Sequence, residues 1–469
     1  MGMRPVRERG TLSVVAFDLT AVRRGLAENP ALPFDLLRPL LDAPDRVTWA
    51  ALAGRSDLTR AAVRRLATTD SPAVRIALAR NPVGAAHGWD LLVDDADVDV
   101  RTALADNHWR HGDIPRDFPL PEPAQVRLAD DPAGRVRRMM AFRRDPAPAV
   151  GRRLAADPSA DVRCEVARHW RRAPADVART WFTDPDPGVR RAALFRHLPP
   201  AELVAGLLAD PETRAEAAGR VRLVPDTAED LASDPDPEVR WAVARNPTLP
   251  APLVVRLADD PDPEVRAEIM LRRDLPDDVR ARVAASVEPQ DYHVAGWLVD
   301  AALDVRLAHV DSPFAFCRRA VASSKCLPAP AIARLATDED FSVRLLLAEN
   351  HPEVPGAVFA TVLPRTGHAA WLLGSHPSIP TDLLVAMAGS DDERDRNVAA
   401  ISPHLPAPNA VDLAEHRVAT TRRCVAANVA LPLSAILRLL HDPDSGVVTA
   451  AASNPRLPPT AARDLLAAG

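Results

Sequence analysis

A short motif recurs along this chain at a nearly constant spacing. Asp-Pro-Glu-Val-Arg occurs at 236–240 and again at 262–266, so the two copies are 26 residues apart. The position of the valine in this motif can be followed through the sequence, mostly in steps of 25–27 residues, at Val22, Thr48, Val74, Val100, Val136, Val162, Val189, Thr213, Val239, Val265, Asp291, Cys317, Val343, His368, Asp395, Thr421 and Val447. A repeat of this length predicts a stack of small helical units rather than one globular core.

Each unit carries the signals of two short helices. Asp-Pro at 236–237 suits a helix start, because Asp caps exposed amides and Pro fits the first turn. Apolar residues within 239–245 fall on one helical face. Asn-Pro at 246–247 then predicts a stop, because Pro disfavours a helical residue before it. A second short helix is expected around 253–257, before the next Asp-Pro.

Helices this short are unstable alone, so each unit must bury its apolar face against its neighbours. We therefore expect an all-α solenoid of about 17 units over residues 21–469. Residues 1–20 are expected to form an N-terminal cap, and the tail 460–469 a second one. One step of 36 residues, from Val100 to Val136, predicts a loop inserted at 107–119. The units near Thr213 and Asp291 are degenerate.

The repeated pattern Val-Arg-x-x-Val-Ala-x-Asn-Pro, followed by Leu-Pro-x-x-x-Leu-x-x-Leu-Ala-x-Asp-Pro, resembles the leucine-rich repeat variant family. Residues 239–265 carry the resemblance best, and 74–92, 317–345 and 447–466 carry it well. The resemblance implies a right-handed superhelix of alternating α- and 3₁₀-helices. HEAT-type repeats, which share the Asp-Pro and Val-Arg start, are the nearest alternative. One form of the family holds an iron–sulfur cluster through N-terminal cysteines, but the first cysteine here is Cys164.

Composition excludes several classes of function. A net charge of −6 does not predict a nucleic-acid or anionic-membrane partner. The four cysteines form no CxxC pair, which is typical of a reducing cytosol and leaves no zinc site. No apolar run is long enough for a membrane span. We expect a cytoplasmic protein, with no metal and no other cofactor.

The arginine that follows the valine position is the most regular charged feature. It recurs as Arg23, Arg75, Arg101, Arg137, Arg163, Arg190, Arg214, Arg240, Arg266, Arg318, Arg344, Arg396 and Arg422. One interpretation is structural, with each arginine pairing with aspartates or carbonyl groups in the turns between units. The alternative is a stripe that binds anions or peptides.

A basic block spans residues 134–196. It holds 15 arginines and 7 acidic residues, a local balance of 15 − 7 = +8. Arginines interleaved with aromatic rings suit phosphate contacts and base stacking, although a solvated basic face is the simpler interpretation. The candidate partner-binding residues here are Arg143, Arg144, Arg163, Arg168, Arg171, Arg172, Trp170 and Trp181.

The predicted insertion adds two further candidates. Trp109 and Phe118 could contact a partner, as aromatic residues do at binding hot spots. The pair His108 and His111 supplies too few ligands for a metal site. The acidic run 95–99 resembles a calcium loop but lacks the required glycine, so its aspartates are better explained as helix caps.

No catalytic motif stands out, so the function expected is that of a non-catalytic scaffold that binds another macromolecule, most simply a protein. A monomer is favoured. One alternative is a nucleic-acid binder of the HEAT-like DNA-repair type that uses residues 134–196. Another is an enzyme or an enzyme-assembly factor, whose site residues lie far apart in sequence.

Overall fold

The structure is a computed structural model that describes residues 18–42, 45–106, 120–143, 146–287, 293–366 and 370–467. These residues form 34 α-helices and two short 3₁₀-helices, with no strand among them. The expected all-α repeat fold is therefore confirmed. Apart from its repeat units, the chain divides into two compact parts. We call them unit 1, which contains 1–62 and 379–469, and unit 2, which contains 63–378. No helix in the described parts of the chain is long and apolar enough to span a bilayer.

The helices of unit 1 come from both ends of the chain. They are α1 (Leu19–Glu28), α2 (Phe34–Leu37), η1 (Arg38–Leu41), α3 (Arg46–Ala53), α28 (Thr381–Ala388), α29 (Glu393–Ile401), α30 (Ala407–Ala414), α31 (Ala419–Ala426), α32 (Leu433–Leu439), α33 (Ser445–Ala452) and α34 (Pro459–Ala467). Helix α4 (Arg60–Ala67) carries the chain across the boundary at residue 62.

Unit 2 holds the middle of the chain. Its helices are α5 (Pro72–Arg80), α6 (Pro82–Leu92), α7 (Val98–Ala105), α8 (Glu122–Ala129), α9 (Gly134–Ala141), α10 (Pro148–Ala155), α11 (Ala160–His169), α12 (Ala175–Phe182), α13 (Pro187–Arg196), α14 (Ala201–Ala209), α15 (Arg214–Ala218), α16 (Pro225–Leu231), α17 (Pro237–Arg245), α18 (Ala251–Leu257), α19 (Pro263–Met270), α20 (Asp277–Ser286), α21 (Gly296–Val299), α22 (Leu303–Leu307), α23 (Ala315–Ser323), α24 (Ala329–Leu335), α25 (Phe341–Asn350), α26 (Ala357–Val362), η2 (Leu363–Arg365) and α27 (Ala370–Gly374).

The unit with the clearest sequence signals folds as those signals indicate. The Asp236 carboxylate accepts a hydrogen bond from the Glu238 amide at the start of α17, and Pro237 occupies the first turn. Val239 and the small residues that follow it in α17 are buried, as are the apolar residues of α18. The degenerate unit near Thr213 still forms α15, but that helix has only five residues.

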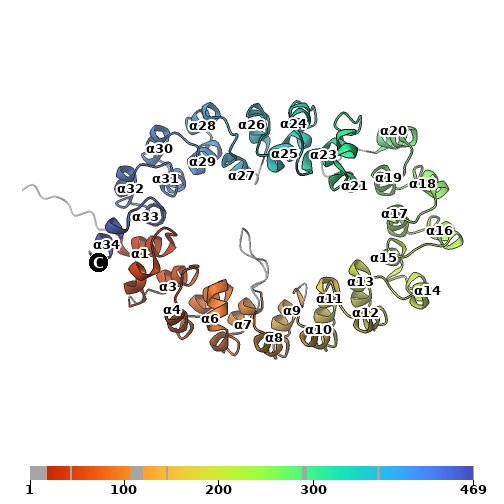
Figure 1. Ribbon diagram of the computed structural model, residues 1–469, viewed down its shortest axis with the longest axis horizontal. Coiled ribbons are helices and arrows are strands. Elements are labelled where there is room, and N and C mark those ends of the chain that lie inside the picture. The colour runs from red at the N-terminus through yellow and green to blue at the C-terminus, as the bar shows by residue number, and fades with distance from the viewer. Residues whose placement is uncertain are drawn as a thin grey trace, which may run out of the picture. The chain divides into compact units, whose positions relative to one another are not determined.

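The first helices of successive units pack side by side. Contacts run from α11 to α13, α15, α17 and α19 in turn, and from α13 to α19 each first helix also contacts the second helix of the preceding unit. Figure 1 shows this arrangement within unit 2. The odd-numbered helices from α9 to α19 form one row, and the even-numbered helices from α10 to α18 form a second row alongside it. The surface of the first row is therefore built from one helix of every unit.

The repeated arginine holds consecutive units together. Arg240 donates to both carboxylate oxygens of Asp260 in the next unit, at 2.8 and 3.0 Å, and to the carbonyl of Asp234 in the turn before its own helix at 2.8 Å. Asp260 also accepts from the Asp262 amide, which fixes the following turn. Equivalent arginine–aspartate pairs are Arg75–Asp95, Arg101–Asp131, Arg137–Asp157, Arg163–Asp184, Arg190–Asp210, Arg214–Asp234, Arg318–Asp338 and Arg422–Asp442. We call these arginine–aspartate pairs the ladder. At these positions the structural interpretation of the arginines is correct.

Asparagine at the end of the first helix makes a second link between units. The buried Asn246 amide donates to the carbonyls of Ala218 and Val221 in the preceding unit, at 2.7 and 2.8 Å. Its backbone is extended, as Pro247 requires. The sequence predicted only a helix stop here, and the structure adds a side-chain clamp on the neighbouring unit.

We expect the arginine–aspartate pairs to dominate local stability. Removing one partner of a buried ion pair costs about 3–5 kcal/mol, because the other charge stays buried without a partner. The side chains of Arg240 and Asp260 are only 12% and 3% exposed. Arg240→Ala should therefore increase amide hydrogen exchange strongly in α17 and α19. The control Arg334→Ala removes an exposed pair with Asp311, worth about 0–1 kcal/mol. Equal effects of the two variants would contradict the ladder's structural role.

The same pairs predict a loss of stability in acid. Burial raises the pKa of Asp184 and Asp442, but hydrogen bonds from their arginines and from backbone amides outweigh it and leave each pKa below its usual value. Unfolded aspartate has a pKa of about 3.9, so the stabilisation is complete above that pH. It is lost as the pH falls from there toward the lower folded pKa. Thermal unfolding between pH 6 and 3 should show this loss, and Asp442→Asn should reduce its slope. An unchanged slope would exclude this pair as a source.

Candidate functional site

The two tryptophans proposed as stacking residues are part of the core. Trp170 is 3% exposed and Trp181 is fully buried, with their ring centroids 6.3 Å apart. The Trp170 ring lies directly against Gly151, where any Cβ would come within 2.5 Å of it. The prediction that these two rings contact a partner was wrong, because the units use them to fill the space between neighbouring helices.

The arginines of the basic block are mostly engaged with acidic residues of adjacent units. Arg163 belongs to the ladder described above. Arg135 pairs with Asp99 at 2.8 Å, and Arg153 pairs with Asp130 at 2.6 Å. The local excess of positive charge in the sequence is therefore offset in the fold by acids from outside the block.

The other candidate partner-binding residues differ in how exposed they are. Arg143 is half-buried, whereas Arg168, Arg171 and Arg172 are exposed. Arg144, Trp109, Phe118 and the histidines of the predicted insertion lie outside the described residues. Of the candidates that the structure describes, Arg168 alone lines the groove described next.

A groove runs across the first-row helices of unit 2. Its walls come from α11, α13, α15, α17 and α19, and its volume is about 1210 Å³. It follows the line of the stack, so each unit contributes a few side chains to it. We call it the unit 2 groove.

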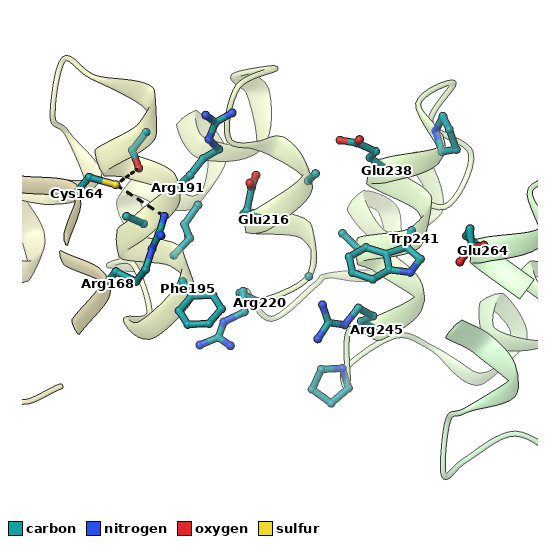
Figure 2. Close-up of a pocket in the computed structure, with 18 of the residues that line it drawn as sticks. Cys164, Arg168, Arg191, Phe195, Glu216, Arg220, Glu238, Trp241, Arg245 and Glu264 are labelled. Atoms are coloured by element: carbon teal, nitrogen blue, oxygen red, sulfur yellow. Dashed lines mark hydrogen bonds between the residues drawn. The ribbon is translucent and has the colours of Figure 1, made fainter. Parts of the chain in front are cut away.

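The two edges of the unit 2 groove differ in chemistry. Figure 2 shows Phe195, Arg220 and Arg245 along one edge, and Glu216 and Glu238 along the other. Arg191 also lies on the second edge, where it pairs with Glu212 at 3.5 Å. Among the described residues, no hydrogen bond or ion pair engages the Arg220 guanidinium or the carboxylates of Glu216 and Glu238. These three charged side chains are also exposed, so they are accessible to a ligand in the groove.

Aromatic rings add an apolar component. Phe195 is 59% exposed, and the Trp241 ring lies between the two edges (Figure 2). The Arg245 guanidinium lies 4.7 Å from the centroid of the Trp241 ring, a cation–π contact that orients both side chains toward the groove. Tryptophan and arginine are the side chains enriched at the hot spots of binding surfaces.

The groove residues occupy fixed positions of the repeat. Several of them stand two or six residues after the valine position, such as Cys164 and Arg168, or Trp241 and Arg245. These positions lie on the helical face opposite the buried one. Phe195, Arg220, Trp241 and Arg245 were not among the predicted residues, because the density of charge along the chain does not single them out. Comparing these two positions from unit to unit would have found three of the four.

The groove offers little for catalysis among its described residues. Cys164 is half-buried, and burial raises the pKa of its thiol, which keeps it protonated. Its sulfur lies 3.6 Å from the Gly188 carbonyl oxygen and 3.9 Å from an Arg168 nitrogen. No histidine lines the groove.

No metal site is found within the described ranges, where no group of three or more histidine, cysteine or acidic side chains could hold an ion. The acidic run at 95–99 serves the fold. Asp95 pairs with Arg75, and the Asp97 carboxylate accepts from the Asp99 amide at the start of α7. Its interpretation as helix-capping residues is consistent with these contacts.

Paired short helices stacked along one axis, with a groove on their first row, define an α-helical repeat protein. One complete unit, residues 237–262, matches the model of the leucine-rich repeat variant family. A solved structure described as a leucine-rich repeat variant with a novel repetitive protein structural motif is similar at 25% identity. That match covers 43% of this chain and 87% of the other, with a TM-score of 0.30. The comparison with curated proteins gave no match.

Proposed function

We propose that this chain is a non-catalytic scaffold whose unit 2 groove binds an extended segment of a protein partner. The observation that carries the proposal is a groove that holds the exposed Phe195 ring of α13 and the Trp241 ring of α17, with both basic and acidic side chains along its edges. Aromatic and arginine side chains in a concave surface are typical of protein-binding hot spots. The groove also follows the repeat axis, which suits a partner in extended conformation.

The charges of the groove favour a protein over a nucleic acid. A polyanion in the groove would meet the carboxylates of Glu216, Glu238 and Glu264, and each would repel its phosphates. A peptide can place acidic residues against Arg220 and Arg245 and basic residues against the opposite edge. Complementary charge of this kind selects the partner and its orientation.

The absence of a reactive group among the groove's described residues supports a binding role. A protonated Cys164 is a poor nucleophile. The histidines at the ends of α11 and α13 pack against other rings, His169 against Phe142 and His197 against the buried Trp181. The proposal is therefore recognition without turnover.

Selection of peptides from a random library on the purified full-length chain tests the proposal. Trp241→Ala should weaken the selected peptides at least about tenfold, since a hot-spot side chain contributes about 2 kcal/mol or more and 1.4 kcal/mol is a factor of ten. The control is Trp371→Ala, which removes a tryptophan that is 61% exposed in unit 2 but outside the groove. Equal affinities for both variants, or selection of no peptide at all, would overturn the proposal.

Charge reversal tests which edge binds which residues. Arg220→Glu should weaken peptides that carry acidic residues and should select peptides in which lysine or arginine replaces them. The measurement is the change in peptide composition between selections on the parent and on the variant. Salt-dependent retention on DNA that Arg220→Glu abolishes, with no peptide selected, would instead favour a nucleic-acid partner.

A further inference from the structure

The two ends of the chain meet in unit 1. Helix α1 packs against α33 and also touches α34, although more than 400 residues of chain separate them in sequence (Figure 1). Val22, Leu26 and Ala27 of α1 are buried, as are Val448 and Ala452 of α33. This contact has the same form as the contact of α31 with α33 and that of α1 with α3, in which first helices of consecutive units pack together.

The hydrogen bonds at this contact repeat those inside the array. Asn454 donates to the carbonyls of Ala426 and Asn428, which lie 28 and 26 residues before it. Asn29 donates in the same way to Ala452 and Asn454, at 3.1 and 2.8 Å. If one further unit followed the last one, an asparagine that bonds Ala452 and Asn454 in this way would lie 28 residues after 452 and 26 residues after 454, which is position 480 in both cases. Asn29 therefore stands where the asparagine of one further unit would stand after the last one.

The packing at the contact is specific for a small residue. A Cβ on Gly25 would lie 2.3 Å from the Thr449 carbonyl oxygen and 2.5 Å from the Ala452 Cβ. The Thr449 hydroxyl also donates to the Ala21 carbonyl at 3.3 Å. A glycine in the middle of a helix costs stability, so its presence at this point of close approach indicates that α1 is adapted to the surface of α33.

From these contacts we infer that the C-terminal face of the array is a docking site for the chain's own N-terminal unit. The N-terminal unit binds there as the next repeat, so within unit 1 neither α1 nor α33 presents an uncovered face. The interfaces of α1 with α3 and of α31 with α33 join helices that are close in the chain. The interface of α1 with α33 joins helices from the two ends of the chain, so non-covalent contacts alone hold it together. This inference is independent of the groove and its partner.

Energy transfer between fluorophores on the two ends tests the inference. Single cysteines at the exposed positions Glu28 and Pro455 carry the dyes, in the full-length chain with its four native cysteines replaced. The parent should show strong transfer within one molecule. Gly25→Leu should abolish it while helix content is retained. Gly206→Leu is the matched control, because a Cβ there meets nothing within 4 Å, and it should leave the transfer unchanged.

A second pair of variants separates docking from general destabilisation. Asn29→Ala removes two hydrogen bonds at the interface of α1 with α33, and Asn246→Ala removes the equivalent two at an interface inside unit 2. Both should lower stability, but only Asn29→Ala should reduce the transfer. Unchanged transfer in both Gly25→Leu and Asn29→Ala would overturn the inference. Transfer that appears only between separately labelled molecules would also overturn it, because the ends would then pair between two copies.

Discussion

Helices of seven to nine residues, such as α17 and α18, bury too little surface to be stable alone, so every unit depends on the interface with the next one. Small apolar side chains let the first helices approach closely, and the core is rich in alanine, valine and leucine. The polar links then fix the register between units. An arginine reaches forward to an aspartate of the next unit, and an asparagine reaches back to carbonyls of the preceding unit. The regular repeat of the sequence reflects this need for identical interfaces.

This use of charge explains why counting charges along the chain was misleading. The block 134–196 has an excess of arginines in sequence, but pairs such as Arg135–Asp99 and Arg153–Asp130 join its arginines to acids outside it, 36 and 23 positions away. The charges of these arginines are therefore neutralised by acids of other units, and a count over one segment of sequence does not show it. The side chains left available are those that the ladder does not use, and they lie on the face of the first helices, where Phe195, Arg220 and Trp241 define the proposed binding groove.

The two proposals concern different surfaces of the same architecture. The unit 2 groove is built from helix faces that no neighbour covers, so its residues are released from the demands of stacking and can differ from unit to unit. The contact of α1 with α33 uses the same hydrogen bonds as the stacking of consecutive units, with Asn29 in the place of a repeat asparagine. One surface is suited to a partner of different chemistry, and the other is suited to a further copy of the repeat.

The sequence by itself determined the class of fold, the unit length, the helix starts at Asp-Pro and the stops at Asn-Pro, because these features depend on residues a few positions apart. It also indicated the structural role of the repeated arginines. The tertiary structure decided that Trp170 and Trp181 are buried, that Phe195 and Trp241 share a groove, and that Asn29 binds the carbonyls of Ala452 and Asn454. The physical reason is that burial and contact between units depend on the rotation of each helix against its neighbours, and on which units meet in space. Neither of these is written in the spacing along the chain.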